Sequence, residues 1–151
     1  MRAFSPVIEL GASRVPVGLS SDGLWVYESW EGQLLSLEEQ PGPFMVTILQ
    51  LGEAFKPMLI SGLEAQGLDP VLAATFPVHV CVRMGLRESD FWQGLAVDWV
   101  EREASEGQFL HELEALAIHG RTQRIRHGAR RLVRKAVVQA TASGELAHPD
   151  R

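Results

Sequence analysis

The sequence predicts an α+β fold: a small N-terminal antiparallel three-stranded sheet followed by a predominantly helical bundle or solenoid layer. Alternating apolar residues and turn signals fill the first part of the chain, and apolar residues at helical spacing recur after the stretch PGP. We expect a single domain over residues 1–151. It would consist of a β-meander over 1–40, helices over 43–142 and a frayed tail over 143–151.

A three-stranded meander is predicted near residues 14–38. The segments VPVGL and LWVY flank Asp22-Gly23, a strong hairpin signal, because both central residues of a primed turn need positive φ. We therefore expect these two segments to pair antiparallel. A second turn is expected at Glu31-Gly32, before QLLSL, and the earlier segment PVIEL is a candidate for an additional strand.

The stretch PGP ends the strand region, because proline fixes φ and lacks an N–H, and a proline suits the first turn of a helix. Residues 44–51 combine helical spacing with the strand-like run FMVTIL, which leaves helix and strand open. Pro57 is expected to begin a second short helix, capped by Gly67. Residues 77–84 are ambiguous in the same way, and we expect a helix kinked near Pro77.

Three amphipathic helices are predicted after Ser89, the expected N-cap of the first. The second stops at Gly120, and the third runs from about Arg121 to Ala142. We expect their apolar stripes to be buried together as one core, formed by Trp92, Leu95, Trp99, Leu113, Leu116, Ile125, Leu132 and Val133.

The run QRIRHGARRL contains Arg126, Ala129 and Leu132 in an Arg-x-x-Ala-x-x-Leu pattern. This pattern resembles the second helix of a HEAT-like repeat. The resemblance covers about one helix, and no second copy occurs at the ~40-residue period of such repeats. It implies a HEAT-like solenoid layer as one architecture beside the bundle, and no family.

The composition is that of a folded, soluble protein, because 46% of the 151 residues are hydrophobic and 22% are charged. The single cysteine, Cys81, cannot form an internal disulfide. No uncharged apolar run approaches the ~20 residues of a membrane helix, and the N-terminus lacks a signal-peptide pattern. We expect a cytoplasmic protein without membrane association.

The net charge of −5 conceals an uneven distribution of charge along the chain. Residues 1–118 contain six Lys/Arg and seventeen Asp/Glu, whereas residues 119–135 contain seven Lys/Arg and no acid. On a helix these cations repel one another at i, i+4, at a cost of some tenths of a kcal/mol per pair. Negative charge must therefore come from neighbouring helices or from a partner.

The candidate binding residues are those cations that the helical wheel places on the polar face: Arg126, Arg130, Arg131, Arg134 and Lys135. The two preceding helices supply acids that could pair with them: Asp98, Glu101, Glu103, Glu106, Glu112 and Glu114. We expect the arginines mainly to face these acids. The outermost, Arg130 and Arg134, would then be free to meet a partner.

No catalytic residue, metal ligand or cofactor is predicted. The segment HELEALAIH lacks the HExxH spacing of a zinc site, and His79 beside Cys81 lacks an orienting carboxylate. Cys81 is expected to be a buried structural residue. Trp25 and Trp30 have opposite strand parity, so one of them is a candidate for exposure, which would mark a protein-binding patch.

The preferred function is a non-catalytic protein-interaction module. One alternative is a nucleic-acid-binding protein that uses the arginine-rich C-terminal helix, because arginine density favours phosphate contacts. A second alternative is an enzyme with an unrecognised site at the junction of sheet and helices. The sequence leaves the partner, the pathway and the oligomeric state open, including formation of a homo-oligomer.

Overall fold

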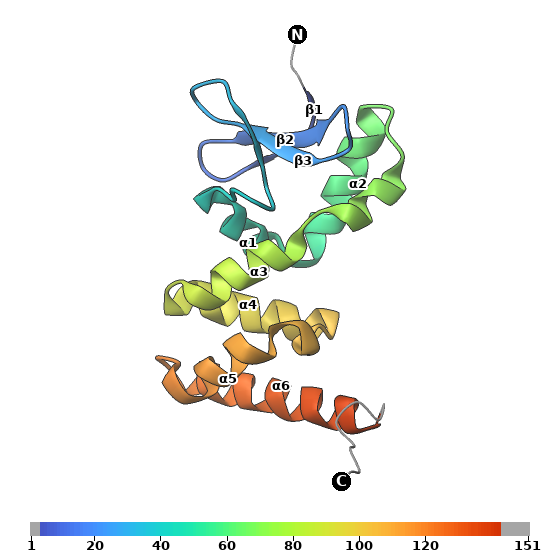
Figure 1. Cartoon of the computed structure of the whole chain (residues 1–151). Helices are drawn as coiled ribbons and strands as arrows, with labels where there is room; N and C mark the ends of the chain where they lie inside the picture. Colours follow the sequence, from blue (N-terminus) through green and yellow to red (C-terminus); the bar gives the residue numbers. More distant parts are fainter. Residues whose placement is uncertain (1–3, 143–151) are drawn as a thin grey trace. The chain divides into compact units, whose positions relative to one another are not determined.

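A computed structural model describes residues 4–142, and the α+β prediction is confirmed: an antiparallel sheet precedes a series of helices (Figure 1). The chain divides into two compact units, Met1–Cys81 and Val82–Arg151. The boundary between them lies inside helix α3, Val78–Arg87, and not at the change of sequence period near residue 42. The single-domain interpretation stays a prediction, and the expected frayed tail, 143–151, lies outside the described residues.

The sheet has four strands, so the prediction of three is wrong. They are β1 (Phe4–Leu10), β2 (Val15–Ser20), β3 (Trp25–Glu28) and β4 (Leu34–Ser36), all antiparallel and in sequence order. The candidate segment PVIEL forms most of β1. Its buried Ile8 and Leu10 give β1 the alternation of a half-buried strand. The register of β1 shifts between Pro6 and Ile8, next to a residue that cannot donate to the ladder.

The hairpin predicted at Asp22-Gly23 is confirmed, with Leu19 opposite Trp25 and Val17 opposite Tyr27. The predicted turn type is wrong. Among the described residues, positive φ occurs at Gly23 (81°) but not at Asp22. Gly23 N–H donates to the Ser20 carbonyl over 3.0 Å, which makes a type I turn followed by a left-handed glycine, the usual three-residue hairpin loop.

The turn between β3 and β4 repeats this arrangement, as the Glu31-Gly32 signal indicated. Gly32 has φ 88° and donates to the Ser29 carbonyl over 2.9 Å. Ser29 N–H in turn donates to the Gln33 carbonyl over 2.7 Å, and Ser29 Oγ accepts from Gln33 N–H over 3.1 Å. Both loops are therefore fixed by hydrogen bonds of the residues at their ends, and the residues at their tips are not needed for this geometry.

The segment after the sheet is helical, which resolves the ambiguity over residues 44–51. It consists of the 3₁₀ helix η1 (Pro43–Thr47), α1 (Ile48–Leu51), the 3₁₀ helix η2 (Gly52–Ala54) and α2 (Phe55–Ala65). α2 begins two residues before Pro57, contrary to prediction, because a proline in the first turn needs no hydrogen-bond donor. The predicted cap at Gly67 is confirmed: it has φ 72°, and its N–H donates to Glu64.

Aromatic side chains bring the sheet and helices of the first unit together. Trp25 is 5.0 Å from Phe76, and Phe55 is 5.1 Å from the same ring, both edge to face. The Trp25 Nε1–H donates to Thr75 Oγ1 over 2.8 Å, which satisfies the buried indole. Gly62 lets α2 approach β1, because a side chain there would collide with the Val7 carbonyl.

Residues 78–84 are helical and Pro77 is not, so the predicted kink is a complete break. The 3₁₀ helix η3 (Pro70–Thr75) ends before Phe76, whose ψ of 133° is extended, and α3 begins after Pro77. The break has a steric cause, since proline excludes the helical region for the residue that precedes it.

The second unit contains the three predicted helices and a short addition: α4 (Asp90–Glu103), the 3₁₀ helix η4 (Glu106–Phe109), α5 (Leu110–His119) and α6 (Gln123–Ala142). α6 packs against α4, α5 and η4. The predicted core residues Trp99, Leu113, Leu116, Ile125 and Leu132 are buried, whereas Trp92, Leu95 and Val133 are partly exposed.

Two glycine substitutions should change stability in opposite directions. Gly23→Ala should lower the free energy of unfolding by about 1–2 kcal/mol, because alanine is strained at positive φ. Gly94→Ala should raise it by up to about 1 kcal/mol, because Gly94 is inside α4 and an added Cβ would meet no atom within 4 Å. Urea denaturation measures both, and equal effects of the two variants would contradict the turn geometry.

Candidate functional site

The last helix, α6, carries the candidate site and is held by its apolar face. Thr122 Oγ1 accepts from Ile125 N–H over 3.1 Å and so caps the first turn. Gly128 permits a close approach to α4, because a Cβ there would lie 3.1 Å from Val97. The opposite face of α6 is left to solvent, and the buried positions are Ile125, Gly128, Ala129, Leu132 and Ala136.

The seven cations of residues 119–135 have different surroundings. Arg131 pairs with Glu101 of α4 over 3.0 Å, and Arg124 lies 3.7 Å from Asp98 of the same helix. Arg126 instead donates to the Gly120 carbonyl over 2.7 Å, where α5 ends. Within residues 4–142, the remaining four have no acidic partner and are exposed: Arg121, Arg130, Arg134 and Lys135.

The expectation that the arginines mainly face acids of their own chain is therefore wrong, although Arg130 and Arg134 are exposed and have no acidic partner within residues 4–142, as expected. Both ion pairs of α6 come from α4 and none from α5 in the described chain. One reason is that Glu112, on α5, pairs with two arginines of α3 instead. Of the five candidate binding residues, the structure brings four together on the exposed surface of α6: Arg130, Arg131, Arg134 and Lys135. The fifth, Arg126, is half-buried on α6 and donates to the Gly120 carbonyl at the end of α5.

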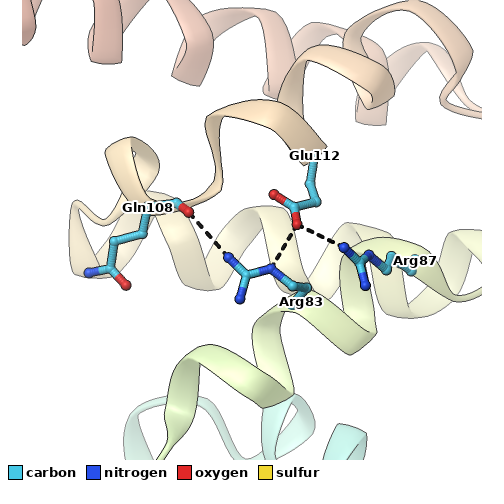
Figure 2. A network of polar contacts seen from close by, with 4 residues as sticks. All are labelled: Arg83, Arg87, Gln108 and Glu112. Atoms are coloured by element: carbon cyan, nitrogen blue, oxygen red, sulfur yellow. Dashed lines mark hydrogen bonds and ion pairs between the residues drawn. The ribbon is translucent and has the colours of Figure 1, made fainter.

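Figure 2 shows where the Glu112 carboxylate points. Its Oε2 accepts from Arg83 Nε over 2.7 Å and from Arg87 over 3.2 Å, both on α3. Arg83 also donates to the Gln108 carbonyl over 3.3 Å and lies 5.1 Å from the Phe109 ring. Burial would raise the pKa of Glu112, but the Arg83 hydrogen bond and the two positive charges outweigh it, so the pKa is lowered. The sequence pattern did not predict this network, although Arg83 and Arg87 have i, i+4 spacing.

Glu106 is another acid that does not meet α6 cations. It is fully buried at the start of η4, and neither carboxylate oxygen has a hydrogen-bond partner within the described chain. The remaining two predicted acids are at the surface: Glu103 lies 3.9 Å from Arg102, and Glu114 is exposed. Among residues 4–142, the acids that pair with α6 cations are thus Asp98 and Glu101.

Exposed apolar side chains accompany the free cations of α6. Val137 is 43% exposed and Val138 is 65% exposed. At about 100° per residue, they lie on the same side of the helix as Arg130 and Arg134. We call these four residues, Arg130, Arg134, Val137 and Val138, the α6 outer face.

A hollow of about 530 Å³ lies beside the first turns of α6. The α4 residues Phe91, Gly94 and Leu95 line it, together with Arg124 and Ile125 of α6. Because Gly94 has no side chain and Phe91 is 57% exposed, the hollow has accessible apolar surface beside the charged residues Arg124, Asp90 and Asp98, which also line it.

The other candidates from the sequence, Cys81 and His79, form no catalytic or metal-binding arrangement within residues 4–142. Cys81 is buried, and burial raises the pKa of its thiol to about 12, which keeps it protonated at neutral pH. His79 lies 3.6 Å from Glu38 at the surface, so a carboxylate does lie beside it, contrary to the interpretation of the sequence. Residues 4–142 contain no group of three or more metal-ligating side chains close together, and no helix among them could cross a bilayer.

Trp25 lies in β3, whereas Trp30 lies in the β3–β4 loop, so the interpretation that both stand on a strand is wrong, and strand parity does not explain their different exposure. Trp25 is 5% exposed, whereas Trp30 is 95% exposed at the tip of the β3–β4 loop.

No protein-family model matches this chain, and comparison with curated proteins and with solved structures likewise finds no match. The case for function therefore depends on the exposed surfaces of α6 and the β3–β4 loop.

Proposed function

We propose that this chain is a non-catalytic protein-interaction module that binds an acidic protein surface through the α6 outer face. The observation that carries this proposal is the lack of acidic partners for Arg130 and Arg134 on an exposed helix face within the described chain. Two like charges at i, i+4 repel each other, and an acidic partner removes that repulsion. A cytoplasmic location and a HEAT-like layering of the helices are part of the same proposal.

The apolar residues favour protein over nucleic acid as the partner. Val137 and Val138 extend the face beyond the two arginines, and a protein surface offers apolar groups that a phosphate backbone lacks. The net charge of −5 also opposes approach of a polyanion of nucleic-acid length. The alternative of an enzyme at the junction of sheet and helices has no observation in its favour among the described residues.

The test is binding to a fluorescent polyglutamate peptide, with duplex and single-stranded oligonucleotides in parallel, at about 0.15 M salt, where the Debye length is ~8 Å. We expect the peptide to bind the parent chain at least about tenfold more tightly than Arg130→Glu/Arg134→Glu. The control is Arg14→Glu/Lys56→Glu, which changes the net charge equally but far from α6 in sequence. It should bind nearly as the parent does.

Two outcomes would overturn the proposal. Equal loss of peptide binding in both double variants would show that net charge, and not the α6 outer face, governs binding. Submicromolar oligonucleotide binding at this salt concentration, abolished by Arg130→Glu/Arg134→Glu with circular dichroism unchanged, would establish the nucleic-acid alternative instead.

A further inference from the structure

Trp30 is presented on a fixed loop and makes almost no contact with its own chain. It is 95% exposed, although tryptophan is normally largely buried. The hydrogen bonds of Ser29, Gly32 and Gln33 hold the loop backbone, so little conformational freedom would be lost on binding. An exposed aromatic side chain on a backbone held in this way is typical of an interface anchor.

The surroundings of Trp30 are acidic and partly apolar. Glu28 and Glu31 flank it and are exposed, and Leu34, opposite Glu28 in the ladder, is 37% exposed. Residues 1–81 as a whole contain three Lys/Arg and nine Asp/Glu. A surface that receives this loop must therefore offer an apolar patch for the indole and cations for the neighbouring carboxylates.

The α6 outer face has these properties. Arg134 and Val138 are one helical turn apart, about 6 Å along the axis, and Arg130 is one turn before them. Trp30 and Glu31 are likewise neighbours on the loop. An indole on Val137 and Val138 would bring Glu31 and Glu28 toward Arg134 and Arg130, and an arginine beside the ring would add a cation–π contact.

We propose that the Trp30 loop of one copy of this chain docks on the α6 outer face of a second copy. This inference deepens the proposed function, on which it depends, by naming the acidic partner. The contact joins two different surfaces, so it is heterologous, and a docked pair keeps one free loop and one free face, each on a different copy. Self-association should therefore extend beyond a dimer as the concentration rises, unless the geometry closes a ring.

Complementary variants test the contact on the full chain. Trp30→Ala removes the anchor but leaves the face, and Arg130→Glu/Arg134→Glu removes the face but leaves the loop. In sedimentation velocity up to about 100 µM, a range suited to weak interfaces, each variant alone should stay monomeric where the parent associates. An equimolar mixture of the two should form a 1:1 dimer and nothing larger.

Matched controls separate this contact from other changes. Leu24→Ala removes an exposed apolar side chain from the other hairpin and should associate as the parent does. Arg14→Glu/Lys56→Glu controls for net charge. A parent that stays monomeric throughout, or a variant mixture that forms no dimer, would overturn the inference.

The failure of this inference can be distinguished from that of the proposed function. If polyglutamate binds the α6 outer face but the parent does not self-associate, the face has another acidic partner and only the inference is wrong. If Trp30→Ala weakens association and Arg130→Glu/Arg134→Glu does not, the loops pair with each other or with a different surface, and docking on α6 is wrong. If neither peptide nor second copy depends on Arg130 and Arg134, both proposals are wrong.

Discussion

Replacing Leu132 by alanine should destabilise the protein by about 2–5 kcal/mol, the usual cost of a large-to-small change in a packed core. Leu132 is 0% exposed on the buried face of α6, which packs against α4, α5 and η4. The loss therefore combines lost apolar burial with a cavity that three neighbouring elements cannot fill by a simple shift. Urea denaturation followed by tryptophan fluorescence measures the change.

Ile118→Ala is the control for Leu132→Ala. Ile118 is a side chain of the same size on the adjacent helix α5, but it is 70% exposed, so its loss should cost well under 1 kcal/mol. A melt of Leu132→Ala that matches the parent would place Leu132 outside the core and would contradict the helix phase that puts Arg130 and Arg134 on the surface.

Glu112→Gln should lower the free energy of unfolding by about 1–3 kcal/mol at neutral pH. The Glu112 side chain is 12% exposed and accepts hydrogen bonds from Arg83 and Arg87, so the substitution leaves two arginines without their carboxylate (Figure 2). Glu114→Gln, two residues along α5 and exposed, is the matched control and should have little effect.

The Glu112 contribution should depend on pH with a definite sign. Because the folded-state pKa of Glu112 is lowered, its stabilisation is complete above the ordinary glutamate value of about 4.3 and disappears as the pH falls through the folded-state pKa. The stability difference between the parent and Glu112→Gln should therefore be constant near neutrality and shrink in acid. A difference that grows below pH ~4 would contradict the assignment.

The sequence predicts those parts of the fold that local patterns encode. The Asp22-Gly23 hairpin, the helix stops at Gly67 and Gly120 and the buried stripe of α6 each depend on nearby residues. From the sequence, β1 is only a candidate strand, because it contains Pro6, which cannot donate to a ladder, and the register of its pairing shifts there.

The candidate site was harder to predict, because it depends on which charges meet across helices. The wheel places Arg130 and Arg134 on the outside of α6 correctly. The helical wheel does not reveal that Glu112 forms ion pairs with Arg83 and Arg87, or that Glu106 is buried. Charge pairing between helices depends on crossing geometry and on distances of a few ångströms, which periodicity within one helix does not contain.

The two hairpin loops share one backbone geometry but differ in the residues at their tips. Ser20 and Ser29 begin them, Gly23 and Gly32 end them, and between these positions one loop has Ser21-Asp22 and the other Trp30-Glu31. The loop with Ser21-Asp22 shows that this backbone geometry forms without an aromatic residue. Tryptophan at position 30 is thus not a requirement of the architecture, and selection can alter the chemistry displayed there almost independently of the scaffold. Such a position allows recognition to evolve at little risk to folding, as in loops that diversify on a constant framework.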